Sequence, residues 1–172
     1  MNIAEQQTAD TAAQTTVTIR RAEESDIPRI DVLLGQVLDV HHAGRPDLFR
    51  AHARKYDDDQ LRAIIADDDR PIFVADVPGL PVAGYAFCVF QRHPDDHILT
   101  DITTLYVDDL CVDEAARGTH VGSALYRHVI GFARESGCHN VTLNVWSCNP
   151  QAMAFYEHMG LRPYKVGMEA LL

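Results

Sequence analysis

The sequence predicts a single α/β domain built on a mixed sheet, and three observations support this expectation. Segments that alternate apolar and polar residues, as strands do, recur between segments whose apolar residues have helical spacing. In the second half a strand, a helix and a further strand follow one another, which predicts a parallel crossover. The length of 172 residues fits one domain with a substantial core. We place this domain at residues 17–172, after a flexible, polar N-terminal arm at residues 1–16.

In the first half, capping residues and helix breakers set the expected boundaries. Ser25 or Asp26 caps a helix with Pro28 in its first turn, and the Gly and Pro residues of segment 41–46 end it. Acidic residues favour the first turn of a helix, so the run 57–59 opens a short second helix. The expected elements are a strand at 17–21, these two helices, and a hairpin of strands 71–77 and 82–91 around a Pro-Gly-Leu-Pro turn.

The second half predicts an extended segment, then two helices separated by a strand. Apolar residues at helical spacing from Val121 onward mark a helix that stops at Gly137. Asn149 followed by Pro150 opens another helix, which Gly160 ends. The expected elements are strands at 102–112 and 141–145, these two helices, and a final strand at 164–172.

The composition argues against several classes of protein. Acids outnumber bases by 25 to 15, for a formal charge of −10, which argues against a broad nucleic-acid-binding surface. No uncharged stretch is long enough to span a membrane, and the N-terminus carries no basic region followed by an apolar one. The four cysteines match neither a metal-binding pattern nor a disulfide framework. We therefore expect a cytoplasmic protein with no metal site and no nucleic-acid or membrane partner.

One segment has the form of an anion-binding loop. Residues 117–122, with the sequence Arg-Gly-Thr-His-Val-Gly, follow the strand that ends at Val112 and open a helix. Free N–H groups at a helix start can hold a phosphate group, and glycine allows its close approach. Taken alone, the segment fits an ordinary strand-to-helix turn equally well.

A second motif lies further along the chain and makes the first more specific. Asn149 stands at an expected helix start, Tyr156 follows seven residues later, and Gly160-Leu161 ends the helix. Together the two segments resemble the GNAT superfamily of acyl-CoA-dependent N-acetyltransferases, from about residue 105 to the C-terminus. The resemblance implies a mostly antiparallel central sheet with helices on both faces. It also implies direct transfer of an acetyl group from acetyl-CoA to a primary amine in a ternary complex.

The resemblance further implies roles for individual residues. Tyr156 would protonate the leaving CoA thiolate, although the residue pattern also fits a core aromatic beside Phe155. Asn149 would order both the cofactor and the helix start. The main chain of the preceding strand would bind pantetheine, and the loop would bind the pyrophosphate through its N–H groups. The residues so implied in cofactor binding are Leu110, Cys111, Val112, Arg117, Gly118, Thr119, His120, Val121, Gly122, Ser123 and Asn149.

Two residues depart from the family pattern. His120 occupies the place of the first loop glycine, either as an exposed residue at the helix start or as a contact to the phosphates. Asn144 stands where ribosomal-protein N-terminal acetyltransferases of this superfamily carry a Glu, twelve residues before the Tyr. Because an amide accepts no proton at neutral pH, Asn144 cannot be the base.

Two adjacent aspartates are the candidates for the catalytic base. A primary amine with a pKa of about 10.4 is mostly protonated at neutral pH, so a base is expected. Asp108 and Asp109 lie where other members of the family place a carboxylate. Adjacent strand residues face opposite sides, so we expect at most one of them to face the substrate, and we favour Asp109 because it neighbours Leu110. The alternatives are two structural carboxylates, a water chain, or a substrate that is already neutral.

The acceptor is the least specified part of the predicted function. The resemblance places the end of the first helix at the acceptor, which makes His41 and His42 candidate substrate-binding residues, although His41 also fits a buried position on the apolar face. Trp146 is expected in the core. The acidic composition favours a small cationic amine or a peptide amine. Family members are often dimers, so a homodimer is expected. The rival function is a non-catalytic CoA-binding sensor or interaction module.

Overall fold

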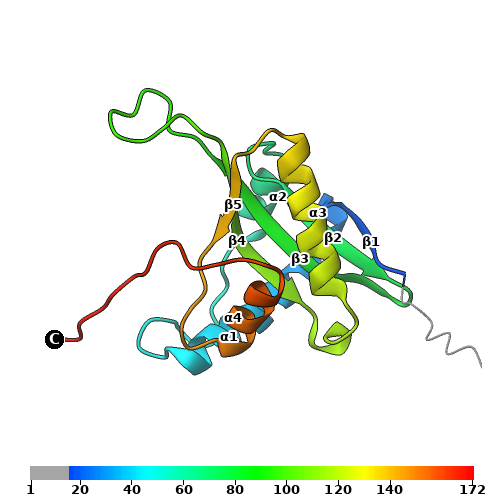
Figure 1. The fold of residues 1–172 in the computed structure, drawn as a ribbon. Helices are drawn as coiled ribbons and strands as arrows, with labels where there is room; N and C mark the ends of the chain where they lie inside the picture. The colour runs from blue at the N-terminus through cyan, green and yellow to red at the C-terminus, as the bar shows by residue number, and fades with distance from the viewer. Residues whose placement is uncertain (1–15) are drawn as a thin grey trace, which may run out of the picture.

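A five-stranded sheet forms the centre of the structure (Figure 1). The computed structural model describes residues 16–172, so the expected arm lies outside the described residues apart from residue 16. The elements in chain order are β1 (Thr18–Arg21), the 3-10 turn η1 (Glu24–Asp26), α1 (Ile27–Gly44), α2 (Asp58–Ile65), β2 (Ile72–Val77), β3 (Leu80–Gln91), β4 (Thr104–Val112), the 3-10 turn η2 (Glu114–Ala116), α3 (Val121–Glu135), β5 (Asn140–Leu143) and α4 (Pro150–His158). No helix within residues 16–172 has both the length and the apolar content needed to cross a membrane.

Strand pairing confirms the mixed, mostly antiparallel sheet. The strands lie in the order β1-β2-β3-β4-β5, and each neighbouring pair from β1 to β4 is antiparallel. β5 runs parallel to β4, because the chain crosses over through α3 between them. The crossover expected in the second half therefore forms.

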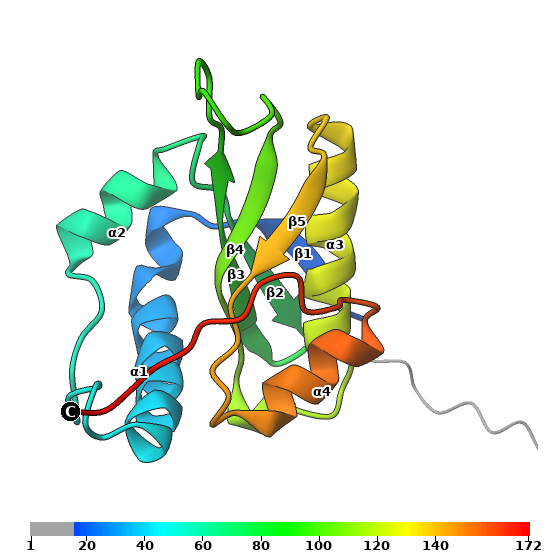
Figure 2. The same ribbon diagram turned by 60° about the vertical axis from the view of Figure 1, so that its left-hand side comes forward.

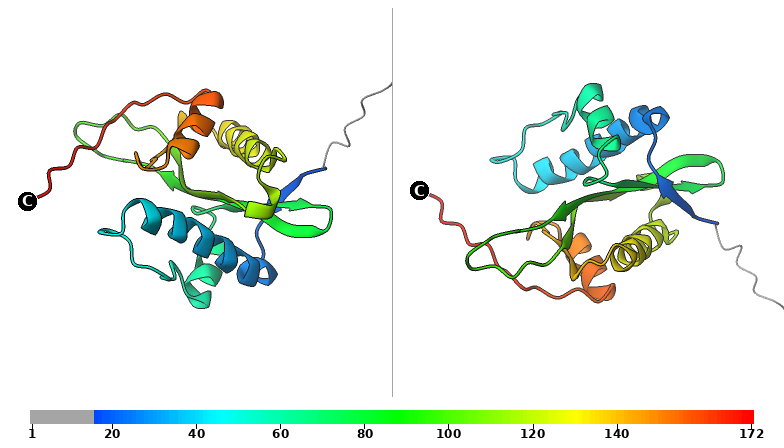
Figure 3. Two further views of the ribbon diagram at one scale, coloured as in Figure 1. Left: turned by 90° about the horizontal axis from the view of Figure 1, so that it is seen from below. Right: turned by 90° about the horizontal axis from the view of Figure 1, so that it is seen from above.

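Helices cover both faces of the sheet, as predicted (Figure 3). α1 and α2 pack on one face through residues such as Ile30, Leu34 and Leu61. α3 packs on the other face through Leu125 and Val129, and α4 lies on that side as well. Successive strand residues point to opposite faces, so a strand covered on both sides needs apolar residues at every position. This explains why β2 and β3 are rich in apolar residues without alternation.

α1 and α2 begin where the sequence predicts. Asp26 stands at the N-cap position of α1 and Pro28 lies in its first turn, but the Asp26 carboxylate makes no capping hydrogen bond to α1 and pairs with Arg20 instead. At α2, the carboxylate of Asp57 accepts a hydrogen bond from the N–H of Gln60 at 2.8 Å. The Gln60 side chain in turn accepts from the N–H of Asp57 at 2.9 Å, which completes a reciprocal cap.

The expectation of a final strand at 164–172 is wrong. The segment after α4 has no strand partner among the described residues, and it runs across the end of the sheet toward α1 (Figure 2). Its apolar side chains are exposed, with Tyr164 at 74% and Met168 at 91%. Arg45 holds the segment through an ion pair of 2.9 Å to Glu169. An alternating pattern cannot make a strand without a neighbour for its backbone hydrogen bonds. β5 likewise ends at Leu143, two residues before the predicted end.

A buried carboxylate ties α1 to the turn that follows β4. Asp113 accepts from the N–H of Ala115 at 2.7 Å and pairs with Arg29 of α1. Gln36, further along α1, accepts from the N–H of Glu114 at 3.2 Å. Burial opposes the charge on Asp113, but these hydrogen bonds and the Arg29 guanidinium outweigh it and lower the pKa of the carboxyl. The end of β4 is therefore held in place by α1.

The Arg29→Ala change should lower the free energy of unfolding by about 3 kcal/mol, because Asp113 would remain buried without its partner. Urea denaturation measures this loss. Arg54 is the matched control: it pairs with Asp31 and Asp58 but its side chain is 47% exposed, so Arg54→Ala should lower the free energy of unfolding clearly less than Arg29→Ala does. Equal losses in the two variants would show that the Arg29 pair contributes no more than a surface ion pair.

Candidate active site

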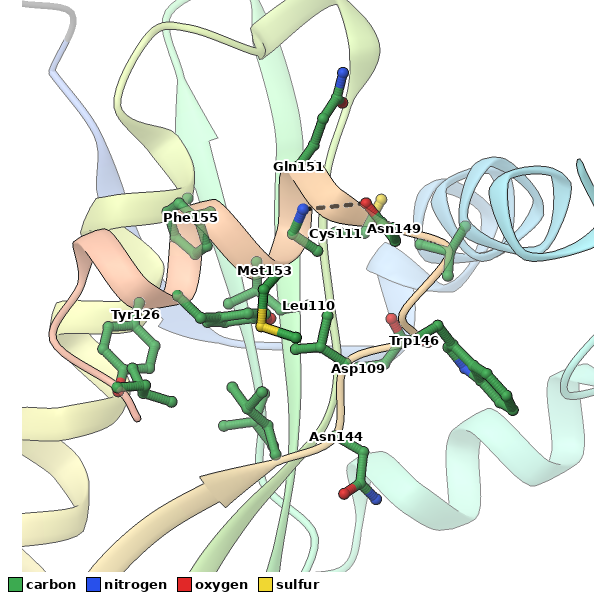
Figure 4. Close-up of a pocket in the computed structure, with 18 of the residues that line it drawn as sticks. Asp109, Leu110, Cys111, Tyr126, Asn144, Trp146, Asn149, Gln151, Met153 and Phe155 are labelled. Atoms are coloured by element: carbon green, nitrogen blue, oxygen red, sulfur yellow. Dashed lines mark hydrogen bonds between the residues drawn. The ribbon is translucent and has the colours of Figure 1, made fainter. Parts of the chain in front are cut away.

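The two parallel strands separate along their length and leave one edge of β4 open. β5 pairs with β4 only over Thr104–Val107, so the remainder of β4 has β3 on one side and no strand on the other. A cavity of about 2050 Å³ opens along this edge, bounded by β4, the start of α3, α4 and the end of α1 (Figure 4). Pockets for a single small ligand usually occupy about 300–1,000 Å³. The cavity therefore has room for a large cofactor and a second substrate.

The main chain of β4 presents polar groups to this cavity at alternate residues. The N–H of Asp113 donates to the carbonyl of Ala83 on β3 at 2.8 Å. In an antiparallel pair the residue two positions earlier, Cys111, faces β3 in the same way. Leu110 and Val112 consequently direct their N–H and C=O groups to the open side. The Val112 carbonyl accepts a long bond of 3.4 Å from the Arg117 guanidinium, and the other main-chain groups of these two residues on the open side are available to a pantetheine contact.

Cys111 was expected to bind the cofactor through its main chain like Leu110 and Val112, but the structure does not support this role. It lines the cavity, but its main-chain groups face β3 and its side chain is 4% exposed. The thiol donates to the carbonyl of Leu33 at 3.6 Å, and burial raises its pKa to about 12. Such a thiol is neither a nucleophile nor an accessible cofactor contact.

The loop before α3 concentrates backbone N–H groups. Gly118 and His120 both have left-handed backbones, with φ of 79° and 67°. The first intrahelical bond is the one from the N–H of Ala124 to His120 at 3.0 Å. The N–H groups of residues 121–123 therefore precede any helical acceptor, whereas those of Arg117 and Thr119 already donate to the carbonyls of Glu114 and Ala116 at 3.4 Å each. His120 adopts the backbone expected of the family glycine, and its side chain is exposed.

The side chains of this loop fold back on the loop itself. The Thr119 hydroxyl donates to the carbonyl of Ala116 at 2.6 Å, and the Arg117 guanidinium lies 3.7 Å from Glu114. A Cβ at Gly122 would lie in ordinary van der Waals contact, 3.4 Å from Val112 and 3.5 Å from Phe155. The loop therefore offers backbone groups, rather than side chains, to an anion.

α4 carries Asn149 at its start and Tyr156 near its end. The Asn149 side chain accepts from the N–H of Ala152 at 3.0 Å, the bond drawn in Figure 4, and so caps the helix. Tyr156 lines the cavity and packs edge-to-face on Tyr126 of α3, with ring centroids 6.2 Å apart. Burial, with the charge of Asp109, raises the pKa of Tyr156 above its ordinary value. The phenol therefore stays protonated at neutral pH and can donate a hydrogen bond.

A β-bulge brings the two candidate aspartates together, contrary to the expected opposite orientation. Asp109 pairs with Phe87 and Val107 with Cys88, which leaves Asp108 as an extra residue in β4. As a result both carboxylates reach the ammonium group of Lys55, each at 3.0 Å. The Asp109 side chain is 8% exposed and that of Asp108 is 33% exposed. Asp109 is the buried member of the pair.

The pKa shifts of Asp109 and Lys55 differ in what they imply for proton transfer. Burial raises the pKa of Asp109, more than the attraction of Lys55 lowers it. For Lys55 the attraction of Asp109 and Asp108 outweighs burial and raises its pKa, so the ammonium stays charged. Burial lowers the pKa of the neighbouring His41, which keeps its ring neutral. Tyr85 adds a buried hydroxyl without a hydrogen-bond partner in the described part of the chain. Asp109 thus has the increased proton affinity that a base requires.

Three rings line the cavity beside this cluster, and we call them the aromatic wall: His41, Phe49 and Trp146. Ring centroids lie 4.9 Å apart for His41 and Phe49 and 5.2 Å apart for Phe49 and Trp146. Trp146 is 40% exposed, so the expectation that it packs in the core is wrong. His42 takes a different role from His41, because its Nδ1 bonds the carbonyl of Phe49 at 2.8 Å and so holds the loop after α1.

Lys55 and Phe49 are site residues that the sequence did not reveal. Both lie in the irregular segment between α1 and α2, where no periodicity marks a face. One signal was present, because Lys55 is one of only two lysines in a chain that otherwise uses arginine. Among residues 16–172, no group of His, Cys, Asp and Glu side chains is placed to hold a metal ion.

The open β4 edge, the loop of residues 117–123 (the N–H loop) and the cavity between them form a site with room for a long anionic ligand beside a strand. Residues 37–161 match the family model described as acetyltransferase (GNAT) family. The chain belongs to this family, whose members generally use acetyl-CoA, and it is an acyltransferase enzyme. Because the chain is an enzyme, the alternative function of a non-catalytic CoA-binding sensor or interaction module is disfavoured.

Named relatives agree with this assignment. The chain is 30% identical over 165 residues to a probable glucosamine 6-phosphate N-acetyltransferase 2 of Oryza sativa subsp. japonica, covering 91% of this chain and 89% of that protein. A solved mutant of the BH1408 protein of Bacillus halodurans has a TM-score of 0.86 and 26% identity, covering 90% of this chain and 99% of that one. An aminoglycoside acetyltransferase from an uncultured soil metagenomic sample, at 18% identity and a TM-score of 0.67, covers 91% of this chain and 96% of its own and shares the fold.

The left-handed backbone of His120 predicts that His120→Gly keeps the fold and the cofactor site. A non-glycine residue in this conformation costs about 1 kcal/mol, which glycine would recover in part, so the free energy of unfolding should stay equal or rise. Calorimetric affinity for acetyl-CoA should stay within about twofold. His120→Ala is the control, because it removes the imidazole and retains the strain. An affinity loss of about tenfold in both variants would instead show that the imidazole contacts the cofactor.

Proposed function

We propose that this protein transfers the acetyl group of acetyl-CoA to a primary amine by direct transfer in a ternary complex. The observation that carries the proposal is that one cavity joins the open β4 edge, the N–H loop, Tyr156 and Asp109. Main-chain groups of Leu110 and Val112 would hold pantetheine, and the N–H groups of Gly118 and residues 120–123 would hold the pyrophosphate, since those of Arg117 and Thr119 already donate to carbonyls. Asn149 would order the start of α4 beside the cofactor. The cofactor supplies an acetyl thioester, whose carbonyl carbon the amine attacks.

Asp109 and Tyr156 would handle the two protons of the transfer. The amine arrives mostly as an ammonium ion, which has no free electron pair, so Asp109 would first accept one proton from it. The free amine would then form the C–N bond. As the C–S bond breaks, the Tyr156 hydroxyl would donate its proton to the sulfur, and the second proton that the nitrogen loses would restore the phenol. Lys55 would hold the carboxylates in place without taking part in the proton transfer, since its own proton is firmly bound. His41, neutral and beside Asp109, is the alternative base.

The experiment that tests this function measures released CoA thiol with DTNB over a panel of primary amines. Alkylamines, arylalkylamines, polyamines, aminoglycosides, amino sugars with and without phosphate, and peptide N-termini cover the classes of acceptor. Release that depends on one class of amine, with the acetylated product seen by mass spectrometry, supports the proposal. A folded protein that binds acetyl-CoA and acetylates none of them would contradict it.

A homodimer and a cytoplasmic location remain predictions. The exposed apolar side chains of the C-terminal segment, such as Tyr164, Val166 and Met168, are the candidate surface for a second copy. Light scattering of the full chain measures the oligomeric state.

Tyr156→Phe should lower turnover by about 10²–10⁴-fold, because the hydroxyl that donates to the leaving sulfur is lost. The ring and its packing on Tyr126 remain, so acetyl-CoA affinity and thermal stability should change little. Tyr126→Phe is the matched control on the facing ring, and it should retain most of the turnover. Full activity in Tyr156→Phe would exclude the phenol as the proton donor.

Asp109→Asn should reduce the rate steeply near neutral pH and recover part of it at high pH, where the amine deprotonates unaided. In the unchanged enzyme, the rate should rise with pH through the pKa of Asp109, which burial raises, because only the carboxylate form accepts a proton. Asp108→Asn is the matched control, since Lys55 keeps Asp109 as its partner and the rate should fall only a few-fold. An unchanged pH profile in Asp109→Asn would move the base to His41 or to water.

A further inference from the structure

The aromatic wall lies on the acceptor side of the proposed reaction centre. His41 comes from α1, Phe49 from the loop after it, and Trp146 from the segment after β5, and all three line the same cavity as Asp109. In Figure 4 the Trp146 ring points away from Tyr126 and Phe155, with Asp109 between the two sides. An amine nitrogen placed beside Asp109 would therefore have the rest of its molecule next to these rings.

The surroundings of the aromatic wall are apolar and open. Leu48 is 51% exposed, Val40 is 39% exposed, and both line the cavity together with the 40% exposed Trp146. Large apolar side chains exposed along a cavity are typical of a surface that a ligand covers. An alkyl or ring-bearing body would remove them from water, which a sugar with its hydroxyl groups would do less well.

The cations on this side of the cavity are already neutralised. Lys55 is held by two aspartates at 3.0 Å each. Arg45 is paired with Asp47 at 2.7 Å and with Glu169 at 2.9 Å. A phosphate bound here would have to displace a carboxylate from one of these cations, at the cost of leaving it without its partner. Among the described residues, the cavity cations outside ion pairs are Arg162 and Lys165, which follow α4.

From this geometry we propose that the acceptor is a primary amine carried on an uncharged, apolar aromatic or alkyl body, with no phosphate and no second amino group, and with that body packed against the aromatic wall. The inference rests on the proposed function and adds the substrate class. On arrival the ammonium ion is attracted both by the carboxylates and by the faces of the rings. The acetylated product is uncharged and loses both attractions, which favours its release.

Trp146 supplies a direct measurement of acceptor binding, because it is the chain's single tryptophan. Its fluorescence is followed while CoA-bound protein is titrated with phenethylamine, spermidine or glucosamine 6-phosphate. We expect a saturable change with phenethylamine and a kcat/KM at least about tenfold higher than for the other two. The absence of a fluorescence change with phenethylamine, or a preference for spermidine or glucosamine 6-phosphate, would overturn the inference.

Variants of the aromatic wall test the same inference through KM. Phe49→Ala should raise the KM for phenethylamine by about tenfold and leave the KM for acetyl-CoA and for ethylamine, which is too short to reach the ring, within about twofold. Trp146→Ala should raise the KM for phenethylamine in the same way. Because Trp146 is partly exposed, this variant still tests the inference if Phe49→Ala fails to fold. Val32→Ala is the control, an equally simple truncation at a position on α1 that is 51% exposed and outside the cavity lining.

The outcomes separate this inference from the proposed function. Acetylation of spermidine or glucosamine 6-phosphate with phenethylamine inactive would overturn the substrate class and leave the acetyltransferase proposal standing. A saturable fluorescence change with phenethylamine but no CoA release from any amine would support the binding class and contradict the proposed reaction. Equal kinetics in Phe49→Ala, Trp146→Ala and Val32→Ala would show that the rings do not contact the acceptor, which overturns the inference.

Discussion

The need of every strand for hydrogen-bonding partners is the constraint on which this site depends. β5 ends after four paired residues, so the second half of β4 keeps an edge whose groups at Leu110 and Val112 have no strand beside them. Backbone groups left without a protein partner must be satisfied by water or by a ligand. The same separation opens the cavity, and it places the start of α3 and the whole of α4 along its sides. The shortness of β5 therefore creates both the open edge and the cavity on which the proposed function depends.

The bulge at Asp108 has an equally direct effect on the chemistry. A regular strand would send neighbouring aspartates to opposite faces, where one would meet α1 and the other α3. The extra residue brings both carboxylates to Lys55, and their close spacing is tolerated because that ammonium lies between them. The two carboxylates differ in burial, since the Asp109 side chain is enclosed and the Asp108 side chain is partly exposed. Burial thus raises the proton affinity of Asp109, while Asp108 stays at the surface.

α1 links these features across the molecule. Its first half pairs with Asp113 and positions the turn that leads to the N–H loop. Its last turn carries His41, which belongs to the aromatic wall and lies near Asp109, and Arg45, just beyond the helix, holds the C-terminal segment. α1 therefore contacts both ends of the cavity, while Phe49 and Trp146 of the aromatic wall come from segments outside it.

The sequence by itself determined the order of the elements, their capping residues, the mixed sheet and the two motifs around residues 117–122 and 149–156. These features depend on local patterns, such as Asp57 with Gln60 or Asn149 with Pro150, which act within a few residues. Only the tertiary structure decided the orientation of Asp108 and Asp109, the place of Lys55, the exposure of Trp146 and the absence of a final strand. Each of these depends on partners distant in the chain: a bulge is defined by the register against β3, an ion pair by two separate segments, and a strand by a neighbour that accepts its hydrogen bonds. Alternation along Tyr164 to Leu172 supplied a strand-like pattern, but without such a neighbour it produced an exposed segment held by one ion pair.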